Sequence, residues 1–220
     1  MQREGNSEKY SIDYVIENED KTLFNKRFLF LGSSITLGAC SMETSFADYL
    51  AKRNRLLYIK EAVNGTTLVD KDEQSYISRL KKIDTKLIFD YVVCQLSTND
   101  ATLSMPLGDE NSQDMNTIGG AINFIIDYVK DKWNKKVIFF TNSFYDNGNY
   151  KKMVDLIKRF EAMNKIFLID LFSDKEFNNI NLETRNLYMA DSIHPTKAGY
   201  LLWWTPIFEK RLIEINNYGK

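Results

Sequence analysis

The sequence is poor in the residues that bind metals and form disulfides. It contains one histidine and two cysteines in 220 residues. Two cysteines cannot build a disulfide framework, and no histidine or cysteine pair has the spacing of a zinc site. We therefore expect no metal site, and we expect Cys40 and Cys94 to be small buried hydrophobic residues.

The chain also lacks an excess of charge of either sign. Its 29 basic and 30 acidic residues leave a formal net charge of -1, so the balance argues against a nucleic-acid partner. No apolar run approaches the ~18 residues of a membrane span, and the polar N-terminus lacks the apolar segment of a signal peptide. These absences predict a soluble, cytoplasmic protein. No pattern in the sequence indicates an oligomeric state.

What the chain does contain is enough apolar material for one core. Hydrophobic residues make up 44% and aromatic residues 13% of the sequence, which is typical of a globular domain. Residues 1–26 are polar and weakly patterned, apart from an alternation at 10–16 that predicts an edge strand. We predict an N-terminal extension, residues 1–26, packed on a single domain of residues 27–220.

Short, unbroken apolar runs alternate with helical patterns from residue 28 onward. The predicted strands are 28–31, 56–63, 87–96, 137–140 and 166–169, and the predicted helices are 44–51, 75–80, 117–133, 150–163 and a C-terminal helix. Asn116 is the expected N-cap of the helix at 117–133, and Pro206 should kink or restart the last one. Strands without polar alternation are typical of a parallel sheet buried on both faces. The sequence therefore predicts an α/β fold with a mainly parallel five-stranded sheet.

Polar clusters follow the predicted strands. They are Gly32-Ser33-Ser34, Asn64-Gly65, Ser97-Thr98-Asn99-Asp100 and Asn142-Ser143. Because ligands of parallel α/β folds bind beyond the carboxyl ends of the strands, we expect all of these clusters at one edge of the sheet.

The sole histidine lies in Asp191-Ser192-Ile193-His194-Pro195. A serine hydroxyl is a weak nucleophile until a base takes its proton, and a carboxylate commonly orients that base. His194 is the base of any histidine-dependent triad by elimination, and Asp191 can turn back to its ring. Ser33 and Ser34 both remain candidate nucleophiles on this reasoning.

Donors for an oxyanion are available in the same layer. They are the backbone N–H of Gly65, the carboxamide of Asn99 and the N–H of the nucleophilic serine itself. Such preorganised donors are what acyl transfer requires.

These stretches together resemble the SGNH hydrolases, the GDSL-type esterase and lipase superfamily. Gly32-Ser33-Ser34-Ile35-Thr36, Asn64-Gly65, Ser97-Thr98-Asn99-Asp100 and Asp191-Ser192-Ile193-His194-Pro195 match four family blocks in order. The resemblance implies Ser34 as nucleophile, His194 and Asp191 as its partners, and Ser34, Gly65 and Asn99 as the oxyanion hole. Ser33 and Ser97 depart from the usual Asp and Gly, which puts the support of the nucleophile turn and the geometry before Asn99 in question.

The resemblance also implies a flavodoxin-like three-layer α/β/α sandwich and a serine esterase that needs no cofactor. Its expected substrate is a small ester, with an acetyl group on a carbohydrate or other polar alcohol as the favoured class. The same triad would also serve an O-acyltransferase. A non-catalytic binding module and a flavodoxin-like nucleotide binder are the rivals, but the latter lacks the Lys-[Ser/Thr] of a phosphate-binding loop.

Three further features have two interpretations each. Cys94 could act as a thiol nucleophile, although its place inside an apolar strand favours core packing. Trp203 and Trp204 suit either the core or the wall of a substrate pocket. Tyr145, beyond the fourth strand, suits either a substrate-lining position or an ordinary loop.

Overall fold

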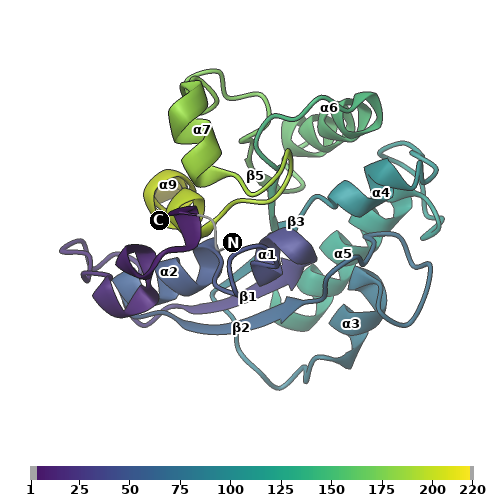
Figure 1. The fold of residues 1–220 in the computed structure, drawn as a ribbon. Helices are drawn as coiled ribbons and strands as arrows, with labels where there is room; N and C mark the ends of the chain where they lie inside the picture. The colour runs from purple at the N-terminus through teal and green to yellow at the C-terminus, as the bar shows by residue number, and fades with distance from the viewer. Residues whose placement is uncertain (1–3, 219–220) are drawn as a thin grey trace.

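The computed structural model describes residues 4–218, and its centre is a five-stranded sheet in which all strands are parallel (Figure 1). The strands are β1 (Arg27–Gly32), β2 (Leu57–Ala62), β3 (Tyr91–Gln95), β4 (Ile138–Phe140) and β5 (Phe167–Ile169). Their order is β2-β1-β3-β4-β5, which is the flavodoxin-like order with a switch point between β1 and β3. The predicted fold class is confirmed.

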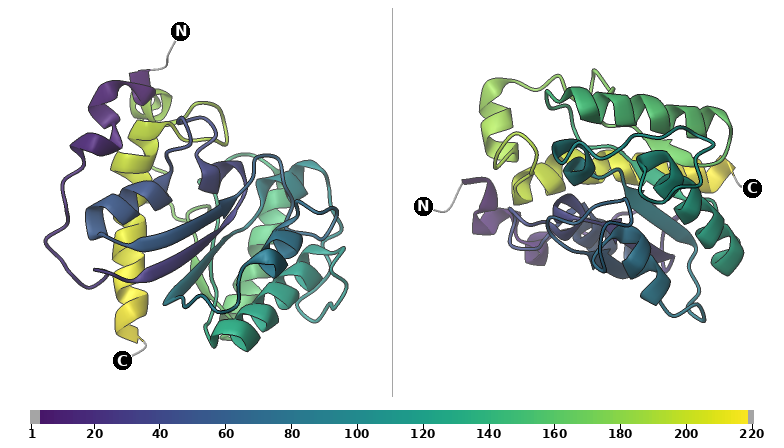
Figure 2. Two further views of the ribbon diagram at one scale, coloured as in Figure 1. Left: turned by 90° about the horizontal axis from the view of Figure 1, so that it is seen from below. Right: turned by 90° about the vertical axis from the view of Figure 1, so that its right-hand side faces the viewer.

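Helices cover both faces of this sheet, as the two views in Figure 2 show. One face packs against α2 (Phe46–Asn54) and α9 (Thr205–Tyr218), and the other against α3 (Tyr76–Lys82), α5 (Ile118–Trp133) and α6 (Gly148–Ala162). Alternate residues of β1, β3, β4 and β5 join opposite clusters: Leu29 and Leu31 pack on the α5 face, whereas Phe28 and Phe30 pack on the α9 face. Burial on both faces explains why these four strands show no polar alternation. The edge strand β2 has no fully buried residue.

Shorter helices connect these elements and shape the carboxyl edge of the sheet. They are α1 (Ser34–Leu37), α4 (Thr98–Thr102), α7 (Leu182–Tyr188), α8 (Lys197–Gly199), the 3-10 turns η1 (Glu4–Asn6), η2 (Glu8–Tyr10) and η3 (Ile12–Tyr14), and the π-helical η4 (Tyr200–Trp204). No helix within residues 4–218 is long and apolar enough to cross a membrane.

The edge strand expected at residues 10–16 is wrong. This segment forms 3-10 turns, in which the Ser11 side chain accepts a hydrogen bond from the Asp13 N–H and Tyr14 N–H bonds the Ser11 carbonyl. Tyr14 and Ile16 point into solvent. Local bonding by a serine side chain offers the backbone an alternative to a sheet ladder. The segment is attached to helix α2 instead of to the sheet, because the Tyr49 hydroxyl donates to the Tyr10 carbonyl at 2.6 Å.

Other predicted elements are present with shifted ends. Strand β3 begins at Tyr91 rather than at residue 87, and the N-cap of α5 is Thr117 rather than Asn116. Helix α7 and the short α4 were not predicted. Pro206 lies in the first turn of α9, directly after the π-helical η4. The backbone stays in the right-handed helical region at Thr205, so the chain changes from π- to α-helix there without the expected restart.

Candidate active site

The turn between β1 and α1 presents Ser34 at the carboxyl edge of the sheet. A Cβ added to Gly32 would lie 2.0 Å from Thr36 Oγ1, so only glycine fits where the chain leaves β1. Ser34 is the first residue of α1, and an N–H at that position has no partner within its own helix. The turn therefore places the Ser34 hydroxyl and a backbone donor side by side.

A tight loop after α7 brings His194 to Ser34. His194 Nε2 lies 2.9 Å from Ser34 Oγ, and His194 Nδ1 lies 2.8 Å from Asp191 Oδ2. The other oxygen of Asp191 accepts hydrogen bonds from the backbone N–H groups of Ile193 and His194, each at 2.7 Å. The carboxylate thus orients the ring and is itself held by the loop that carries the ring.

The electrostatics of this loop keep Asp191 ionised. Partial burial raises the pKa of its carboxyl, but hydrogen bonds from the backbone of His194 and Ile193 and from the His194 ring outweigh that effect, so the pKa lies below its usual value. The side chains of His194 and Asp191 are 23% and 51% exposed. The pair is therefore partly open to solvent.

The structure distinguishes the two serines of the turn. Ser33 is fully buried, and its Oγ accepts a hydrogen bond from Gln95 Nε2 at 3.1 Å. Gln95 Oε1 also accepts from the N–H groups of Ser33 and Thr36 and from the Thr36 hydroxyl. His194 contacts Ser34 and not Ser33. The neutral amide of Gln95, at the end of β3, therefore supports the turn through these hydrogen bonds. Its neighbour is Ser33, which stands where the family usually has Asp.

Gly65 follows the end of β2, and Asn99 follows the end of β3. They are connected through Thr66, the neighbour of Gly65 in the chain, to which Asn99 is hydrogen-bonded. Gly65 has φ +77°, a left-handed conformation that favours glycine, and a Cβ built on it would meet nothing within 4 Å. Asn99 Nδ2 donates to the Thr66 carbonyl at 2.9 Å. Since an amide nitrogen carries two hydrogens, one N–H of Asn99 remains available.

The residues beside Asn99 fix its position. Ser97 is the N-cap of α4, and its side chain accepts from the Asp100 N–H at 3.3 Å. The buried Asp100 carboxylate accepts from the N–H groups of Leu68 and Val69. Serine in place of the family's usual glycine therefore caps the helix that carries Asn99, and Asp100 ties that helix to the segment after Gly65.

Arg79 joins these segments beneath the site and was not identified from the sequence. Its side chain is only 4% exposed. The guanidinium donates to the carbonyls of Gly32 and Glu61, each at 2.7 Å, and to Thr66 Oγ1 at 3.2 Å. One cation therefore links the ends of β1 and β2 to the turn that holds Gly65. The only sequence feature that could have indicated a buried arginine is its position on α3, between apolar residues that face the core.

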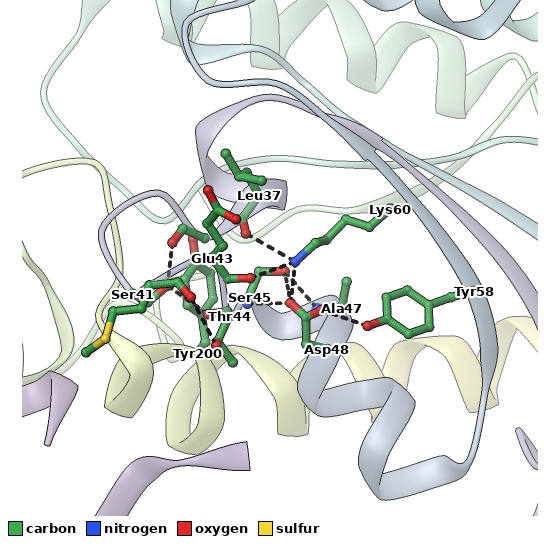
Figure 3. Close-up of polar contacts among 12 residues, drawn as sticks. Leu37, Ser41, Glu43, Thr44, Ser45, Ala47, Asp48, Tyr58, Lys60 and Tyr200 are labelled. Carbon is green, nitrogen blue, oxygen red and sulfur yellow. Dashed lines mark hydrogen bonds and ion pairs between the residues drawn. The ribbon is translucent and has the colours of Figure 1, made fainter. Parts of the chain in front are cut away.

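A second polar cluster, shown in Figure 3, holds the loop that follows α1. Lys60 Nζ lies 2.6 Å from Asp48 Oδ2 and donates to the carbonyls of Leu37 and Glu43. Tyr58 donates to the other oxygen of Asp48. Because Asp48 also completes the capping box of α2, this cluster fixes the path of the chain just beyond the turn that carries Ser34.

The two cysteines have different environments. Cys94 is fully buried in β3, and burial raises the pKa of its thiol far above its usual value. Cys40 is only partly buried, so the expectation that both are buried is wrong for Cys40. Cys40 lies on the loop after α1, close to Asp191 and His194. Within residues 4–218, these three form the only group of histidine, cysteine and acidic side chains placed to hold a metal ion.

The remaining ambiguous residues belong mainly to the interior. Trp203 and Trp204 pack in the α9-face core, and Trp203 stacks on Phe177. Tyr145 is 5% exposed and packs in the opposite core. Asn142, at the end of β4, donates through Nδ2 to the Ile193 carbonyl at 3.2 Å. The β4 end thus supports the histidine loop.

Solved structures with the same fold cover most of this chain. A Lactobacillus plantarum protein has TM-score 0.73 at 19% identity and covers 89% of this chain and 98% of its own. A protein described as lipolytic and of the G-D-S-L family, from Desulfitobacterium hafniense, has TM-score 0.67 at 16% identity, covering 85% and 99%. A variant of an acetyl xylan esterase from Geobacillus stearothermophilus has TM-score 0.61 at 13% identity, covering 87% and 96%. At these identities the similarity shows the fold.

A comparison with curated protein sequences finds no match. The sequence profile of the GDSL-like lipase/acylhydrolase family, however, matches residues 30–202, which include the Ser33-Ser34 turn and the histidine loop. With most of its length matched, this chain belongs to the GDSL-like lipase/acylhydrolase family.

Proposed function

We propose that this protein is a serine esterase that removes small acyl groups, preferentially acetyl, from a carbohydrate or another polar alcohol. The observation that carries the proposal is the continuous chain of hydrogen bonds from Ser34 Oγ through His194 to Asp191. That arrangement supplies a nucleophile, a base and an orienting carboxylate.

In the first half of the proposed reaction, Ser34 Oγ attacks the ester carbonyl while its proton passes to His194 Nε2. The negative charge that develops on the carbonyl oxygen is stabilised by the N–H of Ser34, the N–H of Gly65 and the free N–H of the Asn99 amide. His194 then gives its proton to the departing alkoxide, which leaves as the alcohol. The acyl group remains bonded to Ser34.

In the second half, His194 takes a proton from water, whose oxygen attacks the acyl-enzyme. Collapse of the second tetrahedral intermediate breaks the bond to Ser34, and the serine oxygen recovers its proton from His194. The products are a carboxylic acid and the free enzyme. None of these steps requires a cofactor.

Two observations support a small, polar ester. The side chains of His194 and Asp191 are partly open to solvent. Structures of similar fold include an acetyl xylan esterase and a family two carbohydrate esterase from Clostridium thermocellum.

The test is hydrolysis of p-nitrophenyl acetate, of esters with longer acyl chains and of a panel of acetylated sugars. We expect turnover of acetyl esters, with kcat/KM falling as the acyl chain lengthens. Ser34→Ala should abolish turnover, whereas Ser173→Ala, which removes a surface hydroxyl bonded to Lys158, should not. Wild-type turnover by Ser34→Ala would refute the proposal. Transfer of acetyl to an added sugar in preference to water would identify a transferase instead.

A further inference from the structure

The loop after α1 and the histidine loop bring three metal-binding side chains together. Cys40 Sγ, a carboxylate oxygen of Asp191 and a ring nitrogen of His194 all lie within 4.8 Å of one another. We propose that these residues form an inhibitory site for Zn²⁺, in which the metal captures the base and carboxylate of the triad. The site itself stands on geometry, and only its inhibitory effect rests on the proposed function.

The donor types suit zinc. Thiolate, imidazole and carboxylate are the common protein ligands of Zn²⁺, with bond lengths of about 2.3 Å to sulfur and about 2.0–2.2 Å to nitrogen and oxygen. Two ligands of a tetrahedral ion therefore lie about 3.3–3.6 Å apart. The observed separations, from 2.8 Å between His194 Nδ1 and Asp191 Oδ2 to at most 4.8 Å within the group, lie on both sides of this range, so the proposal requires the side chains to rotate around the ion. Three protein ligands leave a fourth position for water or another small ligand.

The backbone already holds the three residues in place. The Asn6 side chain donates to the Cys40 carbonyl at 2.8 Å and accepts from the Lys197 N–H at 2.9 Å. It therefore bridges the cysteine loop to the helix that follows His194. Asp191 keeps Oδ1 on the backbone N–H groups of its own loop. Its Oδ2, which lies 2.8 Å from His194 Nδ1, is the oxygen that would turn from the ring to the metal. Such supporting contacts preorganise metal ligands.

Metal binding at this site is incompatible with the proposed catalysis. Zn²⁺ takes a lone pair of the neutral His194 ring, and Cys40 loses its thiol proton to solvent as it binds. On Nε2 the metal occupies the position that accepts the Ser34 proton. On Nδ1 it forces the ring proton onto Nε2, which can then no longer accept one. In either case His194 cannot act as a base.

Binding is tested on the Ser34→Ala variant, which retains all three ligands and cannot turn over substrate under the proposed mechanism. Zn²⁺ is titrated in competition with a chromogenic chelator, and Co²⁺ is added separately to look for a thiolate charge-transfer band. We expect one ion per chain and a cobalt–thiolate band. Adding Cys40→Ser should remove the band and weaken Zn²⁺ binding by about tenfold or more. Adding Cys94→Ala, the matched loss of the other thiol, should leave the band and the affinity in place.

Two results would overturn the site. One is that Ser34→Ala binds no Zn²⁺, and the other is that adding Cys40→Ser to it changes the Zn²⁺ affinity by less than about threefold.

The inhibitory effect is measured separately. Each protein's hydrolysis of p-nitrophenyl acetate is normalised to its own rate in chelator. Zn²⁺ should inhibit the wild type reversibly and Cys40→Ser at least about tenfold less potently. Equal inhibition of the two would refute the role of Cys40. A wild type that binds Zn²⁺ but hydrolyses no ester would refute the proposed function and leave the metal site standing.

Discussion

Gln95 and Ser33 exchange two hydrogen bonds at the turn between β1 and α1: the Ser33 N–H donates to Gln95 Oε1 at 3.0 Å, and Gln95 Nε2 donates to Ser33 Oγ at 3.1 Å. Both residues are almost completely inaccessible to solvent. A carboxylate at position 33 would place a longer, negatively charged side chain in this solvent-excluded space, where Gln95 Nε2 now faces the hydroxyl. The serine at this position therefore matches the glutamine below it.

Replacing Gln95 by leucine should loosen this turn. The change leaves the buried N–H groups of Ser33 and Thr36 without an acceptor, and we expect it to lower the free energy of unfolding by about 2–4 kcal/mol. Because the same groups position Ser34, kcat should fall more than KM changes. Chemical denaturation and steady-state kinetics measure the two effects. Gln113→Leu, the same change at an exposed site, is the control, and equal losses in both variants would contradict the role of Gln95.

Arg79→Met should destabilise the sheet edge. The methionine leaves the carbonyls of Gly32 and Glu61 without their buried donor, a loss of about 2–4 kcal/mol in the free energy of unfolding. Arg79→Lys should rescue only part of this loss, since an ammonium group lacks the planar fork that reaches several acceptors. The control Arg211→Met removes a surface arginine paired with Glu214. If Arg79→Lys is as stable as the wild type, a positive charge at this position is sufficient for stability, and the proposed need for the planar guanidinium is wrong.

Asn99→Ala tests the side-chain donor of the proposed oxyanion hole. We expect kcat to fall by about 10²–10³-fold, because the donor is needed most where charge develops. The variant also loses the hydrogen bond to the Thr66 carbonyl, so its thermal unfolding must be compared with that of the wild type. Asn116→Ala, on the exposed loop before α5, serves as the matched control. A change in kcat of less than about threefold in Asn99→Ala would exclude the proposed role.

The pH profile should show one titrating group on its acid side. Hydrogen bonds lower the pKa of Asp191, so this carboxylate stays ionised while the pH falls from 8 toward 5. A protonated His194 cannot accept the Ser34 proton, so kcat/KM should decline with a limiting slope of one. Initial rates with an uncharged acetyl ester measure this profile. A flat profile, or a slope of two, would contradict a single histidine base.

Most of the fold followed from local patterns, and the resemblance to the family blocks selected Ser34 over Ser33 as the candidate nucleophile. Apolar strands and the polar residues at their ends predicted the sheet and its functional edge, and the three-residue spacing of Asp191 and His194 predicted their contact. Gln95, Arg79 and Cys40 act across long sequence separations, so nothing local marked them. The strand predicted at residues 10–16 is wrong because the Ser11 side chain bonds the adjacent backbone there.

The most direct test of the central claim is to find which residue reacts as the nucleophile. The protein is treated with a fluorophosphonate, digested and analysed by mass spectrometry, with His194→Ala and the exposed-site variant Ser173→Ala treated in parallel. The account predicts a single adduct on Ser34, absent or far slower in His194→Ala and unchanged in Ser173→Ala. An adduct on Ser33 or another residue, or equal labelling of Ser34 without His194, would contradict it.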